Sequence, residues 1–156
     1  MKTKKTLLKG GLLVTMNKAR EFFVGDVLIE NNRIAKVAKK IRSSDDMHVV
    51  DVSNHFVIPG LIQTHTHLCQ TLFRGDADDL ALLDWLSQRI WPMENAHTQN
   101  SLKASAQVGL LEMLKGGTTS ILDMGTVRHT HALLETAKES GMRYWGVQSL
   151  SLTVNM

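Results

Sequence analysis

An alternation of two apolar periodicities in residues 61–147 constrains the fold more than any other feature of the sequence. Short apolar, β-branched runs predict strands at residues 61–65, 118–124 and 142–147. Helical spacing predicts a helix at residues 101–115, before the second of these strands, and another at residues 130–140, between the second and the third. Strands that alternate with helices in this order indicate a parallel sheet with right-handed crossovers.

The boundaries of these helices are marked by residues that end a helix. One face of the 101–115 segment carries small and apolar residues at spacings of four, three and four: Leu102, Ala106, Gly109 and Met113. Gly116 and Gly117 follow as its C-terminal stop. A further helical segment, residues 80–91, is predicted to end at Pro92, because proline cannot continue a helix.

The preceding part of the chain is predicted to be all β. Residues 12–14 form a short apolar run, and residues 26–30 and 33–37 flank Asn31-Asn32 as in a β-hairpin. Residues 49–52 and 56–58 have the form of a second hairpin. We therefore predict two domains: a small, sandwich-like β unit at 1–58 and an α/β domain at 59–156.

Three parallel strands cannot close a barrel. A (β/α)₈ barrel has about 250 residues, and only roughly 100 follow the β unit here. The α/β part is thus either a small open sheet or the front part of a larger fold.

Charge and composition exclude several classes of function. The formal charge of +3 is concentrated near the start, in Lys2, Lys4, Lys5 and Lys9, and no later basic stripe interleaves with aromatics. This distribution argues against nucleic acid as a partner. No apolar run has the length of a signal-peptide core or a membrane span, and the single cysteine, Cys69, has no internal partner. A cytoplasmic protein without a membrane partner is predicted.

Two histidines, His65 and His67, end the first strand of the α/β part. Residues two apart on a strand share a face, so both imidazoles can approach one divalent ion. The alternative is an accidental pair that faces solvent. The carboxyl end of a parallel strand, where such folds keep their chemistry, favours a metal site. In contrast, His129 and His131 lie at a predicted helix start, where residues two apart diverge by about 200°, and are predicted to be surface residues.

The segments PGLIQTHTHLCQTLFRGDADDLALLDWLSQRIWPMENAHT and GGTTSILDM resemble the start of the amidohydrolase superfamily barrel. The similarity is greatest to the branch of adenosine-type deaminases and triazine chlorohydrolases, which includes the S-adenosylhomocysteine/methylthioadenosine and 5'-deoxyadenosine deaminases. It extends from about Gly25 to Arg143. The resemblance implies the first three strands of an incomplete (β/α)₈ TIM barrel, preceded by the β unit.

The resemblance also implies roles for individual residues. His65 and His67 match the first two metal ligands of the family, and Glu94 matches a carboxylate that binds ribose hydroxyls, although a helix-end glutamate in solvent is the alternative. Gln70 and Trp85 are candidates for the substrate pocket, with loop packing and core packing as alternatives.

Three further acidic residues receive no assigned role. Asp78 and Asp79 fit loop or capping roles as well as functional ones, and Asp123 ends the second strand without an assigned metal role.

The implied activity is hydrolytic deamination of a small-molecule aminopurine nucleoside, with water activated by one divalent ion. Zinc suits nitrogen ligands best, and iron or manganese would accept them. The runner-up enzymes are a dihydroorotase-like cyclic amidohydrolase and a chlorohydrolase. The longer family members are expected to be homo-oligomers.

The end of the chain departs from the family pattern. Gln148 stands where nucleoside deaminases often carry arginine, residues 149–156 fit poorly, and no residue matches the later proton-transfer groups. No catalytic residue is assigned for this reason. A truncated chain, inactive alone, is predicted; the alternative is a non-catalytic remnant or a complementing fragment.

Overall fold

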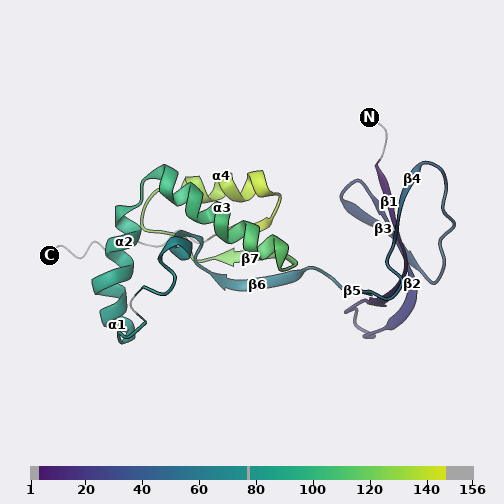
Figure 1. Ribbon diagram of the computed structural model, residues 1–156, viewed down its shortest axis with the longest axis horizontal. Helices are drawn as coiled ribbons and strands as arrows, with labels where there is room; N and C mark the ends of the chain where they lie inside the picture. Colours follow the sequence, from purple (N-terminus) through teal and green to yellow (C-terminus); the bar gives the residue numbers. More distant parts are fainter. Residues whose placement is uncertain (1–3, 77, 147–156) are drawn as a thin grey trace. The chain divides into compact units, whose positions relative to one another are not determined.

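The computed structural model describes residues 4–76 and 78–146, and the chain divides between Pro59 and Gly60 into two compact units. The ribbon of each unit is shown in Figure 1. Val147, at the end of the third predicted strand, and Gln148 and residues 149–156, which depart from the family pattern, lie outside the described residues. No helix in the described ranges is long and apolar enough to cross a membrane.

The first unit is a five-stranded sheet. Its strands are β1 (Lys5–Val14), β2 (Phe22–Glu30), β3 (Arg33–Ala38), β4 (Met47–Asp51) and β5 (Phe56–Val57). The order is β3-β2-β1-β4, with β5 also paired to β1. Leu7, Leu28 and Ile41 form its small core. The predicted all-β character is therefore observed, but residues 4–59 as described form one sheet and supply no second layer of a sandwich.

The first predicted hairpin is confirmed. β2 and β3 are antiparallel, and Glu30 lies opposite Arg33 across the two asparagines. Asn31 has φ 55°, a left-handed conformation that asparagine tolerates better than most residues.

The second predicted hairpin is wrong. β4 and β5 do not pair with each other, because both run parallel to β1. The register of β1 shifts between Leu8 and Gly11, where Gly10 has φ 78°. The chain steps past this bulge through two bonds to β1, from the Val52 N–H to the Lys9 carbonyl and from the Leu12 N–H to the His55 carbonyl. The residues between β4 and β5, which resemble a hairpin turn in the sequence, therefore lie beside the bulge in β1.

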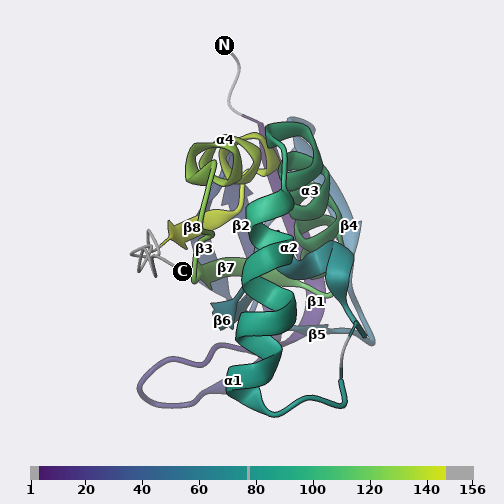
Figure 2. The ribbon, with the colours of Figure 1, turned by 90° about the vertical axis from the view of Figure 1, so that its left-hand side faces the viewer.

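The second unit contains the predicted parallel sheet. β6 (Leu61–Thr66), β7 (Thr118–Asp123) and β8 (Arg143–Gly146) lie in that order, with every pair parallel. α3 (Gln99–Lys115) and α4 (Thr130–Ser140) lie side by side along one face of this sheet, as Figures 1 and 2 show. The main core joins these elements through buried side chains that include Leu68, Leu102, Leu110, Ile121 and Leu133.

The helical segment before α3 differs from the prediction. It consists of the 3₁₀ helix η1 (Leu68–Phe73), then α1 (Leu82–Trp85), the π-helical turn η2 (Leu86–Ile90) and α2 (Trp91–Ala96). The prediction that Pro92 ends the helix is wrong, since the chain stays helical through Ala96. Proline is accommodated in this continuous helix because the π-helical turn η2, whose last bond runs from the Trp91 N–H to the Leu86 carbonyl, interrupts the regular α-helical bonding directly before it.

Candidate metal and substrate site

The end of β6 positions the two histidines that the sequence singles out. His65 lies in β6 and His67 directly follows it, as the residue that precedes η1. Their Nε2 atoms are 3.3 Å apart, and the ring centroids are 5.1 Å apart with an interplanar angle of 64°. The two imidazoles therefore converge on one side of the backbone, even though His67 has left the strand.

This separation fits a shared ion. Two nitrogens bound to one ion at about 2.0–2.1 Å, with an angle of roughly 90–110°, lie about 2.8–3.4 Å apart. Burial lowers the pKa of His67, and the neighbouring His65 lowers it further, against the opposing effect of Glu94 and Asp123. The neutral ring that results is the form that binds metals.

Asp123 at the end of β7 is fully buried beside this pair. Its Oδ1 accepts a hydrogen bond from the Leu68 N–H at 3.1 Å, and its Oδ2 accepts one from the Tyr144 hydroxyl at 2.8 Å. Burial raises the pKa of Asp123 and outweighs these bonds. The carboxylate joins the start of η1 to β7 and β8, so it supports the backbone that carries His67.

Glu94 lies on α2 and is buried, with 6 % exposure. Its Oε1 accepts a hydrogen bond from Gln70 Nε2 at 2.8 Å and one from Cys69 Sγ at 3.4 Å. A nitrogen of His67, the Cys69 sulfur and a Glu94 oxygen all lie within 4.8 Å of one another. The alternative of a solvent-facing helix-end glutamate is therefore wrong, and Glu94 lies beside His67.

These three groups form a second set that could in principle hold an ion. Burial raises the pKa of the Cys69 thiol strongly, and the adjacent Glu94 raises it further. A protonated thiol donates hydrogen bonds and is a poor ligand, since metals bind the thiolate. The two imidazoles of His65 and His67 are therefore the better candidate for a metal.

His97 is a buried member of the site that the sequence analysis did not identify. Its Nε2 lies 2.8 Å from the Cys69 carbonyl, its Nδ1 lies 2.9 Å from Ser101 Oγ, and its ring stacks on Phe73. It ties η1 to the start of α3. The only local signal was the capping box of Thr98 and Ser101, which marks the helix start but gives His97 no role.

The remaining candidates lie outside this cluster. Trp85 is partly buried on α1, and no hydrogen bond or ring contact links it to Glu94 or Gln70 in the described part of the unit. Asp78 and Asp79 are exposed. His129 and His131 are exposed, and His131 lies 3.9 Å from the Glu135 carboxylate.

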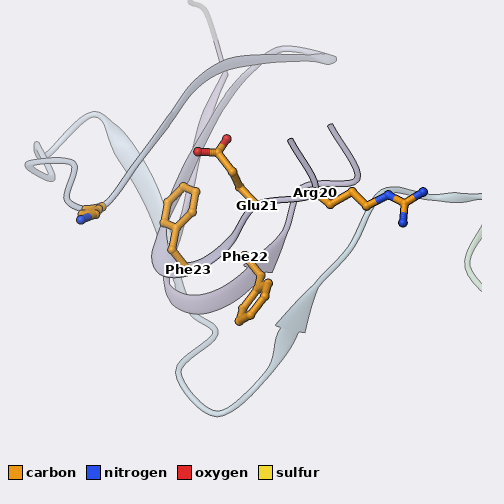
Figure 3. Close-up of a pocket in the computed structure, with 5 residues that line it drawn as sticks. Arg20, Glu21, Phe22 and Phe23 are labelled. Carbon is orange, nitrogen blue, oxygen red and sulfur yellow. The ribbon is translucent and has the colours of Figure 1, made fainter. Parts of the chain in front are cut away.

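A hollow on the first unit is a separate feature. It is lined by Arg20, Glu21, Phe22, Phe23 and Lys39. Figure 3 shows the Arg20 side chain directed away from Glu21 and Phe23. In the same view the Glu21 carboxylate and the Phe22 ring point in opposite directions, so this surface presents no convergent set of metal ligands.

Comparison with known proteins identifies the family to which this chain belongs. The Amidohydrolase family profile matches residues 56–153, and the chain belongs to that family. A 5-methylthioadenosine/S-adenosylhomocysteine deaminase of Thermococcus onnurineus is 45 % identical over 137 residues, which are 88 % of this chain and 31 % of the relative. The Bacillus cereus protein of the same name is 41 % identical over 144 residues, 89 % of this chain and 33 % of the relative.

Solved structures agree with this assignment. An adenosine deaminase from Xanthomonas campestris with bound zinc has a TM-score of 0.80 and 27 % identity, covering 90 % of this chain and 33 % of that one. An atrazine chlorohydrolase from Arthrobacter aurescens in complex with zinc has a TM-score of 0.81 at 22 % identity, covering 92 % of this chain and 35 % of that one. The chain thus spans about a third of the length of these proteins.

Proposed function

We propose that this chain supplies the first metal ligands and part of the substrate pocket of a hydrolase that deaminates aminopurine nucleosides of the adenosine or S-adenosylhomocysteine type. The relatives at 41–45 % identity carry deaminase names, which supports this substrate class. The observation that carries the proposal is the 3.3 Å separation of the His65 and His67 Nε2 atoms at the end of β6.

The fold is proposed to be the start of a (β/α)₈ barrel. The parallel order β6-β7-β8 and the coverage of solved family members at TM-scores of about 0.8 support residues 59–156 as the first β/α units. The β unit at 1–58 is proposed as a separate domain, in agreement with the boundary between the two compact units.

Each proposed role belongs to a residue of the cluster. His65 and His67 would hold one divalent ion, zinc first and iron or manganese as alternatives, and Glu94 would accept hydrogen bonds from ribose hydroxyls. When bound, such an ion lowers the pKa of a water molecule toward neutrality. Gln70 and Trp85 are predicted to contact substrate, and both roles stay predictions.

Residues 1–156 alone are proposed to be inactive. A catalytic zinc site has three protein ligands and an open position, whereas two imidazoles converge here and both oxygens of Asp123 already accept protein donors. A non-catalytic or complementing role for the chain by itself is the alternative. Homo-oligomerisation and a cytoplasmic location also stay predictions.

The test is ammonia release from adenosine and S-adenosylhomocysteine with added zinc. It compares the 156-residue chain with a graft in which residues 1–146 are continued by the rest of the Thermococcus onnurineus relative. We expect turnover by the graft and none by the chain, and loss of turnover and bound zinc in the H65A and H67A grafts. Unchanged activity and zinc content in both variants would contradict the assignment. Chloride release from a chlorotriazine without ammonia release would favour the chlorohydrolase, and hydrolysis of dihydroorotate would favour the cyclic amidohydrolase.

A further inference from the structure

We infer that Gln70 is a positioning residue: with Cys69 it fixes Oε1 of Glu94, so that Oε2 is left to bind the vicinal hydroxyls of a ribose. This inference rests on the proposed function, which gives Glu94 the ribose. It changes the role of Gln70 from a substrate contact to a support for the residue that makes the contact.

The hydrogen bonds to Glu94 all fall on one oxygen. Gln70 Nε2 donates to Oε1 at 2.8 Å, and the single S–H of Cys69 is shared between this oxygen, at 3.4 Å, and the Gly125 carbonyl, at 3.2 Å. No described residue donates to Oε2. The side chain of Glu94 is buried, so its rotation is limited by packing as well as by these donors. One oxygen is thus held by protein, and the other retains its full capacity to accept hydrogen bonds.

The two donors are themselves held in place. Both lie on η1, whose backbone carbonyls are tied to α3 and to His97, the residue that follows α2. Ser105 Oγ donates to the Leu68 carbonyl at 2.8 Å, and His97 Nε2 lies 2.8 Å from the Cys69 carbonyl. The donors therefore come from a rigid element, and the orientation they give to Glu94 does not depend on a mobile loop.

The unoccupied oxygen defines the chemistry of the ligand. An ionised carboxylate oxygen only accepts hydrogen bonds and has two lone pairs, whereas two adjacent hydroxyls offer two donors. Their simultaneous binding requires a fixed carboxylate plane, because charge-assisted hydrogen bonds depend on alignment. The arrangement selects nucleosides with both the 2'- and 3'-hydroxyl, and it would not improve the binding of ligands that lack them.

The test measures equilibrium binding by calorimetry to the metal-free graft, with adenosine and 2',3'-dideoxyadenosine as ligands. We expect Gln70→Ala to weaken adenosine binding about tenfold, which corresponds to about 1.4 kcal/mol, and to leave the dideoxy ligand unaffected. Glu94→Gln should remove the preference for adenosine, and Gln70→Ala should add nothing in that background. Cys69→Ser, which keeps a donor, should weaken adenosine binding less than Cys69→Ala.

The matched control is Gln88→Ala, because Gln88 is an exposed glutamine that bonds Asp84 at 3.2 Å and takes no part in the cluster. We expect it to change neither ligand. If Gln70→Ala weakens both ligands equally, or has no effect while Glu94→Gln removes the preference, the inference fails and the proposed function stands. If the graft binds adenosine with the expected preference but releases no ammonia, the proposed deamination fails and the inference on Gln70 stands. If Glu94→Gln leaves the preference intact, the proposed role of Glu94 fails and the inference fails with it.

Discussion

Removal of one imidazole from the histidine pair should cost most of the zinc affinity of this chain. Four-ligand structural zinc sites bind with about 10–16 kcal/mol, or roughly 2.5–4 kcal/mol per ligand if the four contribute equally. The pair of His65 and His67, with Nε2 atoms 3.3 Å apart, should then contribute about 5–8 kcal/mol, a Kd of about 1–200 µM. His65→Ala or His67→Ala should weaken binding by about a hundredfold to a thousandfold.

The assay is titration of the 156-residue chain with zinc in competition with a chromophoric chelator near neutral pH. The double variant H129A/H131A is the matched control, because it removes the same sequence pattern from a place where both side chains are exposed. It should bind zinc as the unmodified chain does. Cys69→Ser separates the two candidate sites, since His67, Cys69 and Glu94 could hold an ion without His65. Equal affinity in the unmodified, H65A and H67A chains, or a loss in C69S with none in H65A, would refute the reasoning.

Three stability predictions test the two units, one on the first unit and two on the second. Burial by itself would raise the pKa of Asp26, but hydrogen bonds from the Ile41 and Gly10 N–H groups and the charge of Lys9 lower it overall. The ionised Asp26 therefore stabilises the folded first unit above about pH 4, and this stabilisation is lost as the pH falls through the folded pKa. Amide exchange of β1 and β2 should show this acid loss in the unmodified chain and a smaller one in Asp26→Asn. Leu133→Ala should lower the free energy of unfolding of the second unit by about 2–5 kcal/mol, and Leu134→Ala, at a half-exposed position, by much less; denaturant unfolding measures both. Tyr144→Phe removes the donor to Asp123 and should cost about 1–3 kcal/mol in the same assay; no loss would contradict the bond.

The sequence predicted those parts of the fold that depend on local periodicity. The three parallel strands and the helices α3 and α4 appear within about two residues of their predicted ends. The prediction of the second hairpin failed because β4 and β5 both pair with β1, on either side of a bulge that lies far away in the sequence. The prediction that Pro92 ends the helix failed because a π-helical turn directly before the proline already interrupts the regular α-helical hydrogen bonding. Both failures depend on the backbone structure around a residue, about which the spacing of apolar residues in the sequence carries no information.

The residues of the candidate site also fall into those that local sequence patterns predict and those that depend on how distant elements pack. His65 and His67 could be found from the sequence because their relation is set by one strand end. Gln70 and Glu94 are 24 residues apart, and their contact depends on how η1 and α2 pack, so the sequence could name both but not the bond between them. His97 could not be assigned at all, since its partners lie on η1 and α3.

The two HxH motifs show why chemistry follows backbone geometry and not residue type alone. Both have the letters His-Thr-His, yet the first spans the end of β6 and the second spans the start of α4. At the strand end the Nε2 atoms of the two rings lie 3.3 Å apart, and His67 lies beside the buried carboxylate of Glu94. At the helix start His129 takes a left-handed conformation, and His131 turns toward Glu135 one helical turn later. Each pair offers the same donor atoms, so the difference in expected zinc affinity comes from the backbone that presents them, and the comparison of H65A with H129A/H131A measures that difference directly.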